Sequence, residues 1–376
     1  MPAVQNVLVV GAGAAGTATA ILLAEAGVAV DLVDTKPDVS ALGSGITLQG
    51  NALRILRQLG VWDEVRQHGF AFTTLGLRAP DAAGTPLAEI DDIRTGGPDL
   101  PATMGMYRPE LARILVDRAV DAGAKLRLGT IPASLEQDED GVEVRFADGS
   151  RGRYDLVVGA DGVRSWTRHE LGILLETCKT GMGIWRVFAP RPASVTRTDL
   201  FYGGPCFIAG YCPTGEDSLY AYLVEAAQNR STLAPQQSLE VMRELAAAYH
   251  GPWDEIRKSM TDATRVNYTW FEAHFLEAPW NRGRVVLIGD AAHTCPPTIA
   301  QGAAQALEDA AVLYDVLTRA DALTEEMWSE FHARRVERAR AVVEASLQLG
   351  QWLLNHEQGD VSGLIGRISH LLAEPA

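Results

Sequence analysis

Three glycines near the start of the chain have the spacing of a phosphate-binding turn. The run Gly11-Ala12-Gly13-Ala14-Ala15-Gly16 follows an apolar stretch and precedes an Ala- and Leu-rich one. The first glycine allows a tight turn, the second lets the backbone approach a pyrophosphate, and the third lets a helix pack closely on a strand. The helix start would point free N–H groups at phosphate, and Asp34 is placed to accept hydrogen bonds from ribose hydroxyls. The pattern predicts a dinucleotide site that suits FAD or NAD.

Two later fragments place an aspartate directly after an apolar strand. Asp161 occurs in Gly159-Ala160-Asp161-Gly162, and Asp290 occurs in Gly289-Asp290-Ala291-Ala292-His293. Because ligands of parallel sheets bind beyond the carboxyl ends of the strands, both carboxylates could line one crevice. Such dipeptides are commonly turns when they occur alone. The strand before each one favours a ligand-binding role.

Together and in this order, the three fragments resemble the flavin-dependent aromatic hydroxylases, the single-component (group A) FAD monooxygenases related to para-hydroxybenzoate hydroxylase. The resemblance covers most of the chain and is weakest between about residues 181 and 280. It implies that FAD is the cofactor and that NADH or NADPH binds only transiently as electron donor. It also implies that Asp161 lies near flavin and reduced nicotinamide, that Asp290 bonds the ribityl chain, and that Arg108 contacts FAD on the ribityl-phosphate side.

Other segments resemble the family's contacts with the flavin ring. Leu42-Gly43-Ser44-Gly45-Ile46-Thr47-Leu48 is similar to its glycine-rich approach to the flavin. The helix expected from Ala303 to Leu317 would direct its N-terminus at the pyrimidine end of the ring, where negative charge accumulates on reduction. The cofactor-binding residues implied in all are Gly11, Gly13, Ala14, Ala15, Gly16, Asp34, Thr35, Lys36, Gly45, Ile46, Arg108, Ile131, Asp161, Gly289, Asp290, Pro297, Gly302 and Ala303.

Four side chains are the candidates for catalysis. Tyr220 and Tyr222 share one face of an expected strand, where a tyrosine could accept or relay the phenol proton of a substrate and make its ring electron-rich. Packing or contact with water is the alternative for both. Arg186 stands where related enzymes place an arginine near a substrate carboxylate or ring oxygen, with a surface ion pair as the alternative. Thr47 stands where pyridine-hydroxylating relatives carry His, so a His-mediated substrate contact is not expected.

The elements that must position these residues follow from apolar periodicity and turn signals. A strand at 6–10, a helix at 14–26 and a strand at 28–33 form a Rossmann-type unit. Further helices are expected at 50–59 and 108–122, strands at 126–131, 141–146, 155–158 and 285–288, and a long charged helical segment on the exterior at 324–356. The stretch 181–275, where aromatic residues, Thr and Val alternate with Gly and Pro turns, predicts a mostly antiparallel sheet.

The predicted fold class is therefore α/β. A Rossmann-like FAD-binding domain of glutathione-reductase type is expected to carry an inserted, mostly antiparallel β-sheet substrate domain and a C-terminal helical segment. We assign 1–70, 101–180 and 281–320 to the FAD-binding domain, 71–100 and 181–280 to the substrate-binding domain, and 321–376 to the C-terminal helical segment. At 376 residues the chain is long enough for two domains.

Composition excludes several partners. The formal net charge of −15 disfavours nucleic acid and anionic membranes. No run approaches the roughly 20 apolar residues of a membrane span, and the first apolar run leads into glycines rather than forming a secretion signal. Four cysteines lack the spacing of metal ligands, so no metal is expected and buried thiols in a reducing cytoplasm are favoured. We expect a cytoplasmic monomer or homodimer.

The resemblance implies an FAD monooxygenase that uses NAD(P)H and O2 to hydroxylate an activated ring through a flavin C4a-hydroperoxide. Its small substrate would be an aromatic or heteroaromatic compound of phenol, hydroxybenzoate or hydroxypyridine type. Ring-opening oxygenation, a non-aromatic substrate, a halogenase and a non-enzymatic binding module of the same fold are the alternatives. The halogenase segment Trp-x-Trp-x-Ile-Pro is absent from the sequence. Substrate identity and the choice of NADH or NADPH stay open.

Overall fold

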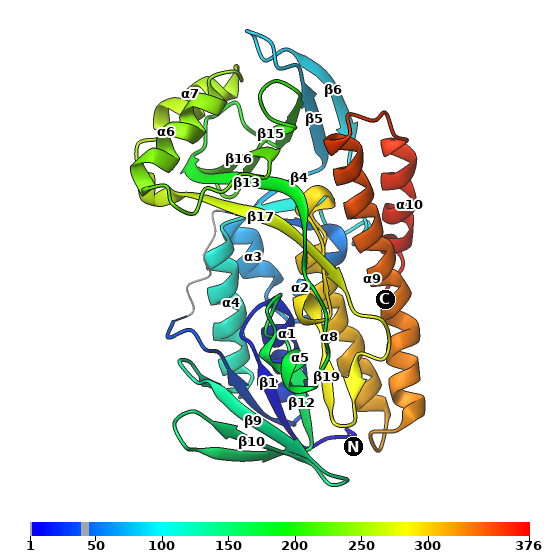
Figure 1. Ribbon diagram of the computed structural model, residues 1–376. Helices are drawn as coiled ribbons and strands as arrows, with labels where there is room; N and C mark the ends of the chain where they lie inside the picture. Colours follow the sequence, from blue (N-terminus) through cyan, green and yellow to red (C-terminus); the bar gives the residue numbers. More distant parts are fainter. Residues whose placement is uncertain (1, 39–44) are drawn as a thin grey trace.

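A six-stranded sheet forms the base of the molecule in this computed structural model, which describes residues 2–38 and 45–376 (Figure 1). Its order is β18-β19-β12-β1-β2-β8, and all pairs are parallel except β18 with β19. The strands are β1 (Asn6–Val10), β2 (Ala29–Val33), β8 (Lys125–Arg127), β12 (Leu156–Gly159), β18 (Asn281–Arg282) and β19 (Val285–Leu287). The central strands are apolar and buried because helices cover the sheet.

Helices pack against this sheet and against each other. α1 (Ala14–Glu25) lies against α4 (Arg108–Asp121) and α8 (Gly302–Arg319), and α2 (Gly50–Gln58) also packs on α8. The short α3 (Trp62–His68) packs on α2 and α4, and α5 (Trp166–Glu170) follows β12. The expected strand, helix and strand at 6–33 are therefore confirmed. The strand expected over 126–131 is wrong beyond Arg127, because the chain turns at Gly129, whose φ is 64°.

An eight-stranded sheet lies above the first one in Figure 1 and has the order β20-β17-β13-β16-β15-β14-β5-β6. Every pair is antiparallel except β14 with β5, which confirms a mostly antiparallel sheet. Its strands are β5 (Thr74–Arg78), β6 (Pro86–Asp91), β13 (Cys178–Pro190), β14 (Thr198–Tyr202), β15 (Ile208–Pro213), β16 (Ser218–Ala226), β17 (Val266–Phe275) and β20 (His293–Thr294).

The two faces of this sheet have different roles. Two helices that were not predicted, α6 (Pro235–Ala246) and α7 (Pro252–Ser259), cover the face that carries Trp185 and Leu219 and build a second core with Trp253. The opposite face turns toward the first sheet. Since side chains alternate along a strand, it is the face of Arg186 and Tyr220.

Two three-stranded sheets and three single turns complete the chain up to α8. The sheet β3-β7-β4 lies where the two large sheets meet. Its strand β7 closely approaches β15, since a Cβ added at Gly105 would lie 1.9 Å from the carbonyl oxygen of Pro213. The hairpin sheet β11-β10-β9 lies at the bottom of Figure 1. Bounds are β3 (Ile46–Gln49), β4 (Phe70–Phe72), β7 (Thr103–Met106), β9 (Pro132–Gln137), β10 (Val142–Phe146), β11 (Arg151–Tyr154), and the 3-10 turns Ala263–Arg265, Gly289–Ala291 and Pro297–Ile299.

The C-terminal segment consists of α9 (Glu325–Leu354), which runs along the length of the molecule, and α10 (Val361–Ala373), which folds back on it (Figure 1). The expectation of an exterior segment is wrong for one face of α9. Phe331 and Arg335 are both 0% exposed, because α9 packs on α8. Within the described part of the chain, we find no helix with the length and apolar character that crossing a membrane requires.

Candidate flavin and substrate site

Gly11 brings the first two sequence fragments into contact. Its N–H donates to the carbonyl of Val33, 2.7 Å away, at the end of the neighbouring strand. Its φ is 106°, and an added Cβ would lie 2.3 Å from the carbonyl oxygen of Ala160. Only glycine tolerates both conditions. The glycine turn therefore lies directly against the segment that carries Asp161.

Gly13 faces open space at the start of α1. A Cβ added there would meet no atom within 4 Å, although φ is an ordinary −78°. No side chain caps the helix, and no acidic residue occupies its first turn. The N–H groups at Ala14 and Ala15 therefore face a space that suits a phosphate. This cradle is the structural evidence that a dinucleotide such as FAD fits here.

Asp34 holds the edge of this cradle. Its Oδ2 accepts a hydrogen bond from the Ala12 N–H at 2.8 Å, and its Oδ1 accepts one from the Lys36 N–H at 2.9 Å. The side chain keeps partial exposure, so a carboxylate lone pair is free for a ribose hydroxyl. Thr35 and Lys36 are exposed. Ile131 is 51% exposed, and the N–H of the residue before it, Thr130, donates to the Asp34 carbonyl. These residues form one edge around Asp34.

Asp161 orders the turn after β12. Its carboxylate accepts hydrogen bonds from Ser165 Oγ at 2.5 Å and from the N–H and Oγ1 of Thr167 at 2.8 and 3.0 Å. Arg168, held in this turn, donates to the carbonyl of Ala291 at 2.8 Å. The Asp-Gly segment is thus bonded to the Gly-Asp segment.

The Gly-Asp segment completes the crevice beside α1. An added Cβ at Gly289, where φ is 59°, would lie 3.0 Å from the Cβ of Ala15. The side chain of Asp290 is accessible from the crevice, and desolvation by the protein atoms packed around it raises the pKa of its carboxyl group. A carboxylate placed on the wall of the crevice can accept a hydrogen bond from a ligand hydroxyl. All three sequence fragments therefore meet around one space.

The start of α8 offers a second open space. An added Cβ at Gly302 would meet no atom within 4 Å, and neither a side-chain cap nor an acidic residue lies at this helix start. Pro297 opens the short turn before it, and Ala303 is the second residue of the helix. The free N–H groups of this turn can face the electron-rich end of a flavin ring. Of the glycine-rich approach segment, Leu42, Gly43 and Ser44 lie outside the described residues.

Thr47 and Tyr220, distant in sequence, are in contact. The Oγ1 of Thr47 lies 2.8 Å from the Tyr220 hydroxyl, and the rings of Tyr220 and Tyr222 stack with centroids 5.4 Å apart. Gly45 leaves room for the ring, since an added Cβ would lie 2.0 Å from Tyr220 Cδ1. Burial raises the pKa of both tyrosines. Their phenols are therefore neutral at pH 7, and Tyr220 with Thr47 can relay a proton.

Arg186 is a cation without an acidic partner among the described residues. It lies opposite Tyr222 on β16 and Asn267 on β17, and its Nη1 donates to Thr269 Oγ1 at 2.7 Å. Burial lowers its pKa to about 10, so the guanidinium stays charged at neutral pH.

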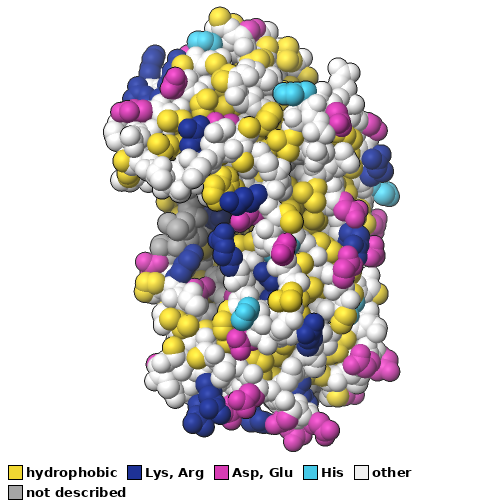
Figure 2. Space-filling model, in the orientation of Figure 1, with side chains coloured by type: hydrophobic (Ala, Val, Ile, Leu, Met, Phe, Trp, Pro, Cys, Tyr) yellow, Lys and Arg dark blue, Asp and Glu magenta, His cyan; other side chains and the backbone are white. Residues whose placement is uncertain are grey.

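Arg108, exposed at the start of α4, likewise has no ion-pair partner in the described ranges. Two unneutralised cations favour anionic ligands. Figure 2 shows Lys and Arg side chains beside a hollow where the upper and lower parts of the molecule meet.

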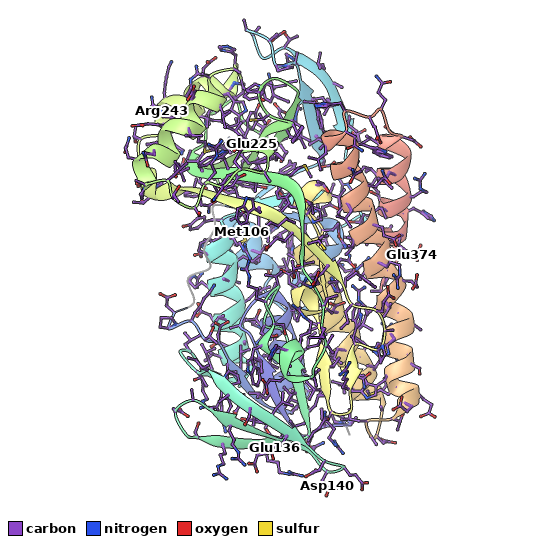
Figure 3. The ribbon with its side chains drawn as sticks, in the orientation of Figure 1. Met106, Glu136, Asp140, Glu225, Arg243 and Glu374 are labelled. Carbon is purple, nitrogen blue, oxygen red and sulfur yellow. The ribbon has the colours of Figure 1, made fainter. Side chains whose placement is uncertain are left out.

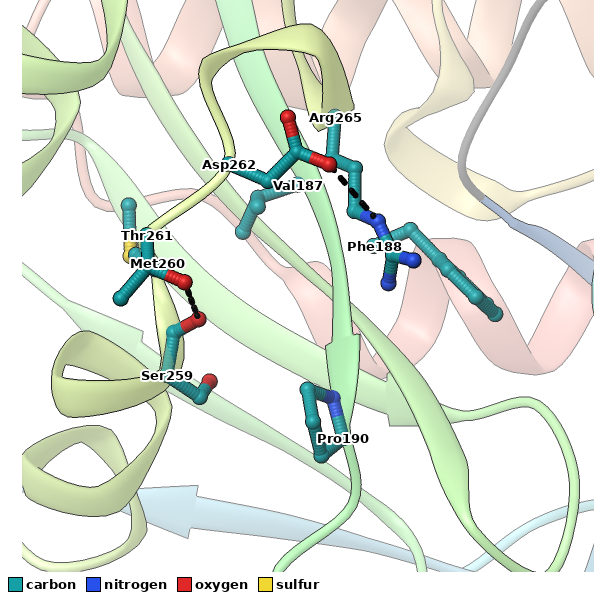
Figure 4. A pocket seen from close by; sticks show the side chains of 8 residues that line it. All are labelled: Val187, Phe188, Pro190, Ser259, Met260, Thr261, Asp262 and Arg265. Carbon is teal, nitrogen blue, oxygen red and sulfur yellow. Dashed lines mark hydrogen bonds and ion pairs between the residues drawn. The ribbon is translucent and has the colours of Figure 1, made fainter.

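Several residues of this region carry no signal in the sequence. The ring of Phe188, two residues after Arg186 and on the same face, lies 4.3 Å from that of Tyr107. Cys212 Sγ lies 3.7 Å from Thr47 Oγ1, and burial raises the thiol pKa to about 11. Phe188 also lines a cavity of about 260 Å³ that opens beside the sheet (Figure 4). Only tertiary contact identifies these residues.

Buried His274 predicts a pH-dependent stability. It bonds the Asp290 carbonyl through Nε2 at 2.9 Å and Thr177 Oγ1 through Nδ1 at 2.8 Å, and burial lowers its pKa to about 4. Because the unfolded chain then binds a proton that the folded chain does not, stability falls as the pH drops from about 6.5 to 4, by up to about 3 kcal/mol. Urea unfolding at pH 5 and 7 checks this. In the variant His274→Gln, the free energy of unfolding should depend less on pH than in the unmodified protein. An equal difference between pH 5 and pH 7 in both proteins would contradict the prediction.

Comparison with known proteins agrees with this geometry. A model of the FAD binding domain matches residues 5–348. The chain is 30% identical to 6-hydroxynicotinate 3-monooxygenase of Pseudomonas fluorescens, covering 94% of this chain and 92% of that protein. It is 28% identical to 3-amino-4-hydroxybenzoate 2-monooxygenase of Streptomyces cremeus, covering 92% and 87%. The tetrameric form of 2-methyl-3-hydroxypyridine-5-carboxylic acid oxygenase matches with a TM-score of 0.78 and 26% identity, covering 94% and 91%.

The matched range includes all three fragments around the crevice, and the relatives are monooxygenases of aromatic compounds. The chain belongs to the FAD-binding domain family and is an FAD-dependent monooxygenase of the aromatic hydroxylase class.

Proposed function

We propose that the chain hydroxylates a phenol or hydroxypyridine ring that carries an acidic group, with NAD(P)H and O2 as cosubstrates. The observation that carries this substrate class is Arg186, a charged side chain on the sheet face that also bears Tyr220, with no acidic partner among residues 2–38 and 45–376. Three relatives are named for substrates that are aromatic or pyridine acids. FAD, when bound, supplies the redox chemistry with nicotinamide and oxygen.

Each residue of the sheet face has a task in this proposal. Arg186 binds the acidic group and so orients the ring. Tyr220 accepts a hydrogen bond from the ring hydroxyl and relays its proton through Thr47 to water as final acceptor, which leaves the ring as an electron-rich phenolate. Phe188, in contact with Tyr107, excludes water from one side.

The residues that would hold FAD follow the crevice from one end to the other. The pyrophosphate would be held by Gly11, Gly13, Ala14, Ala15 and Gly16, and the adenosine end by Asp34, Thr35, Lys36 and Ile131. The ribityl side would be held by Arg108, Asp161, Gly289 and Asp290. The flavin ring would be held by Gly45, Ile46, Pro297, Gly302 and Ala303.

A substrate screen tests the proposal. Hydroxybenzoates, hydroxypyridine carboxylates and their uncharged amides are added to the FAD-loaded enzyme, and NAD(P)H oxidation and product mass are recorded. An acid that accelerates oxidation and gains one oxygen atom supports the proposal, and a gain of two oxygens indicates ring opening instead. If no phenolic or pyridine acid accelerates oxidation, the proposed substrate class is wrong.

Replacing Tyr220 should separate the two halves of the reaction. Tyr220→Phe removes the hydroxyl that contacts Thr47, so we expect hydroxylation to slow by about 100-fold while flavin reduction by NAD(P)H changes less than threefold. Rapid-mixing absorbance measurements separate the two steps. Tyr222→Phe is the matched variant, because the Tyr222 hydroxyl has no hydrogen-bond partner in the described part of the chain; it should slow hydroxylation less. Unchanged turnover in both variants would discard the tyrosine assignment.

Organisation beyond the site completes the proposal. We assign 1–70, 101–180 and 281–320 to an FAD-binding domain, 71–100 and 181–280 to a substrate-binding domain and 321–376 to a C-terminal segment. The placement of β5 and β6 in the eight-stranded sheet supports the assignment of 71–100. A cytoplasmic location is proposed, supported by four free cysteines, of which Cys206 and Cys212 are buried. A monomer or homodimer is proposed as the oligomeric state.

A further inference from the structure

Four charged side chains meet in the interior between α8 and α9. Glu308 and Asp309 of α8 and Arg335 of α9 have 0% exposed side chains, and Arg338 has 7%. Arg335 contacts both acids, with Nη1 2.9 Å from Glu308 and Nε 2.7 Å from Asp309. Arg338 Nε lies 2.8 Å from Glu308 Oε2. Because apolar side chains of similar volume often stabilise a fold as well as buried ion pairs do, stability alone does not account for this α8–α9 charge cluster.

Asp309 of the cluster holds a backbone segment of the flavin site. Asp309 Oδ2 accepts hydrogen bonds from the Gly289 N–H at 2.8 Å and from His293 Nε2 at 2.7 Å. Burial would raise the pKa of Asp309, but His293 and Arg335 outweigh it and lower the pKa to about 2. Asp309 is therefore ionised at every physiological pH and fixes the turn that presents Asp290.

Glu308 acts on the other flavin-side segment through an amide. Its Oε1 accepts a hydrogen bond from Asn51 Nδ2 at 3.0 Å, and the same Nδ2 donates to Gln301 Oε1 at 3.0 Å. Gln301 directly precedes Gly302, where the open space at the start of α8 lies. Asn51 thus links Glu308 to Gln301 and the first turn of α8.

Arg338 extends the cluster to the C-terminal helix. Its Nη1 donates to the Leu371 carbonyl at 2.6 Å and its Nη2 to the Glu374 carbonyl at 2.9 Å, while Arg54 of α2 donates to the Ala373 carbonyl at 3.1 Å. These carbonyls end α10, where no intrahelical donors remain. Figure 3 shows Glu374 beside α9. One guanidinium therefore joins Glu308 and the end of α10.

We propose that Arg338 is a positioning residue through which the docking of α10 orders the flavin site. With α10 docked, Arg338 is fixed, Glu308 is held in one orientation, and Asn51 places Gln301 at the start of α8. Such coupling is reciprocal, so FAD binding must stabilise the docked α10 as much as docked α10 strengthens FAD binding. The proposal rests on the assignment of FAD to this crevice and is independent of the substrate.

Hydrogen exchange on the unmodified protein is the first test. Amide exchange across residues 361–373 is measured for the FAD-loaded protein and for the same protein after FAD removal. We expect exchange in α10 to be at least tenfold slower with FAD bound. Exchange that is the same in both states would overturn the proposal without recourse to any variant.

A pair of arginine variants is the second test. Arg338→Met removes the bridge, whereas Arg334→Met is the matched control, because Arg334 also lies on α9 and donates to the Ala376 carbonyl at 2.7 Å but pairs with Asp315 instead of Glu308. We expect Arg338→Met to weaken FAD binding at least tenfold, measured by flavin fluorescence, and to abolish the effect of FAD on α10 exchange. Arg334→Met should change neither quantity, and Arg338→Lys should recover part of both.

A purely structural role for Arg338 predicts a different result. In that case Arg338→Met would unfold at lower urea concentration but would bind FAD within twofold of the unmodified protein and keep the FAD-dependent protection of α10. This result would overturn the proposal. Should Arg338→Met fail to fold, the exchange measurement on the unmodified protein decides alone. Loss of FAD binding in both methionine variants would also count against a specific bridge.

Discussion

Gly13→Val is expected to fold normally and to lose FAD. The added side chain meets no protein atom within 4 Å of its Cβ, and the φ of −78° suits any residue. The two γ-methyl groups would therefore occupy the space that we assign to the pyrophosphate. We expect FAD affinity to fall by at least 100-fold, which corresponds to at least about 2.7 kcal/mol, while the urea midpoint of the FAD-free protein stays the same. Flavin fluorescence titration and urea unfolding measure the two quantities.

The neighbouring glycine provides the contrast. Gly11→Ala places a Cβ 2.3 Å from the Ala160 carbonyl oxygen at a φ of 106°, so this variant should be less stable even without FAD. Gly13→Ala, with a smaller side chain, should lose less affinity than Gly13→Val. Retention of full FAD affinity by Gly13→Val would show that the space at the start of α1 holds no phosphate.

Arg186→Met should lower kcat/KM for an acidic ring substrate by about 100-fold, or about 2.7 kcal/mol. Methionine has no guanidinium, so the substrate anion loses the charge-assisted hydrogen bonds that Arg186 would donate. In the unmodified protein, this guanidinium is charged and has no acidic partner in the described residues. Steady-state kinetics with the best acid from the screen measures the effect. Most of the loss should appear in KM if the anion is held equally in the ground and transition states.

The matched substrate for this variant is the corresponding amide. Because the amide carries no charge, the unmodified enzyme should use it poorly, and Arg186→Met should use it about as well as the unmodified enzyme does. Arg186→Lys should keep part of the preference for the acid, since a lysine retains the charge but not the planar fork of donors. An equal loss for acid and amide in Arg186→Met would remove Arg186 from anion recognition.

Local patterns were enough to predict the glycine turn and its surroundings. The strand at 6–10, the helix after Gly13 and the strand ending at Val33 depend on apolar periodicity and glycine conformation, which are properties of neighbouring residues. The two aspartate segments were predicted from the apolar strand before each one. Parallel pairing of β1 with β12, and of β12 with β19, then gathers them beside Gly11.

Contacts between distant residues were not predictable in this way. Arg335 and Arg338 occur in a charged helical stretch that favoured an exterior position, yet their partners Glu308 and Asp309 lie on the preceding helix and draw them into the interior. The contact of Thr47 with Tyr220 depends on how β3 meets β16 across two sheets. A single sequence records neither pairing. Ile131 illustrates a smaller error, since one turn at Gly129 ends the expected strand.

Strand β17 restricts how the enzyme can be recombined with its relatives. Its early residues pair with β13 beside Arg186, and its last residue, Phe275, pairs with His293, three positions after Asp290. A chimaera whose crossover falls inside β17 would join half of this strand from one relative to half from another. Backbone N–H and C=O groups of the sheet could then be left without hydrogen-bond partners. Crossovers belong before Val266 and after Thr294. Swapping specificity between relatives at this strand therefore means transplanting the Gly-Asp segment as well.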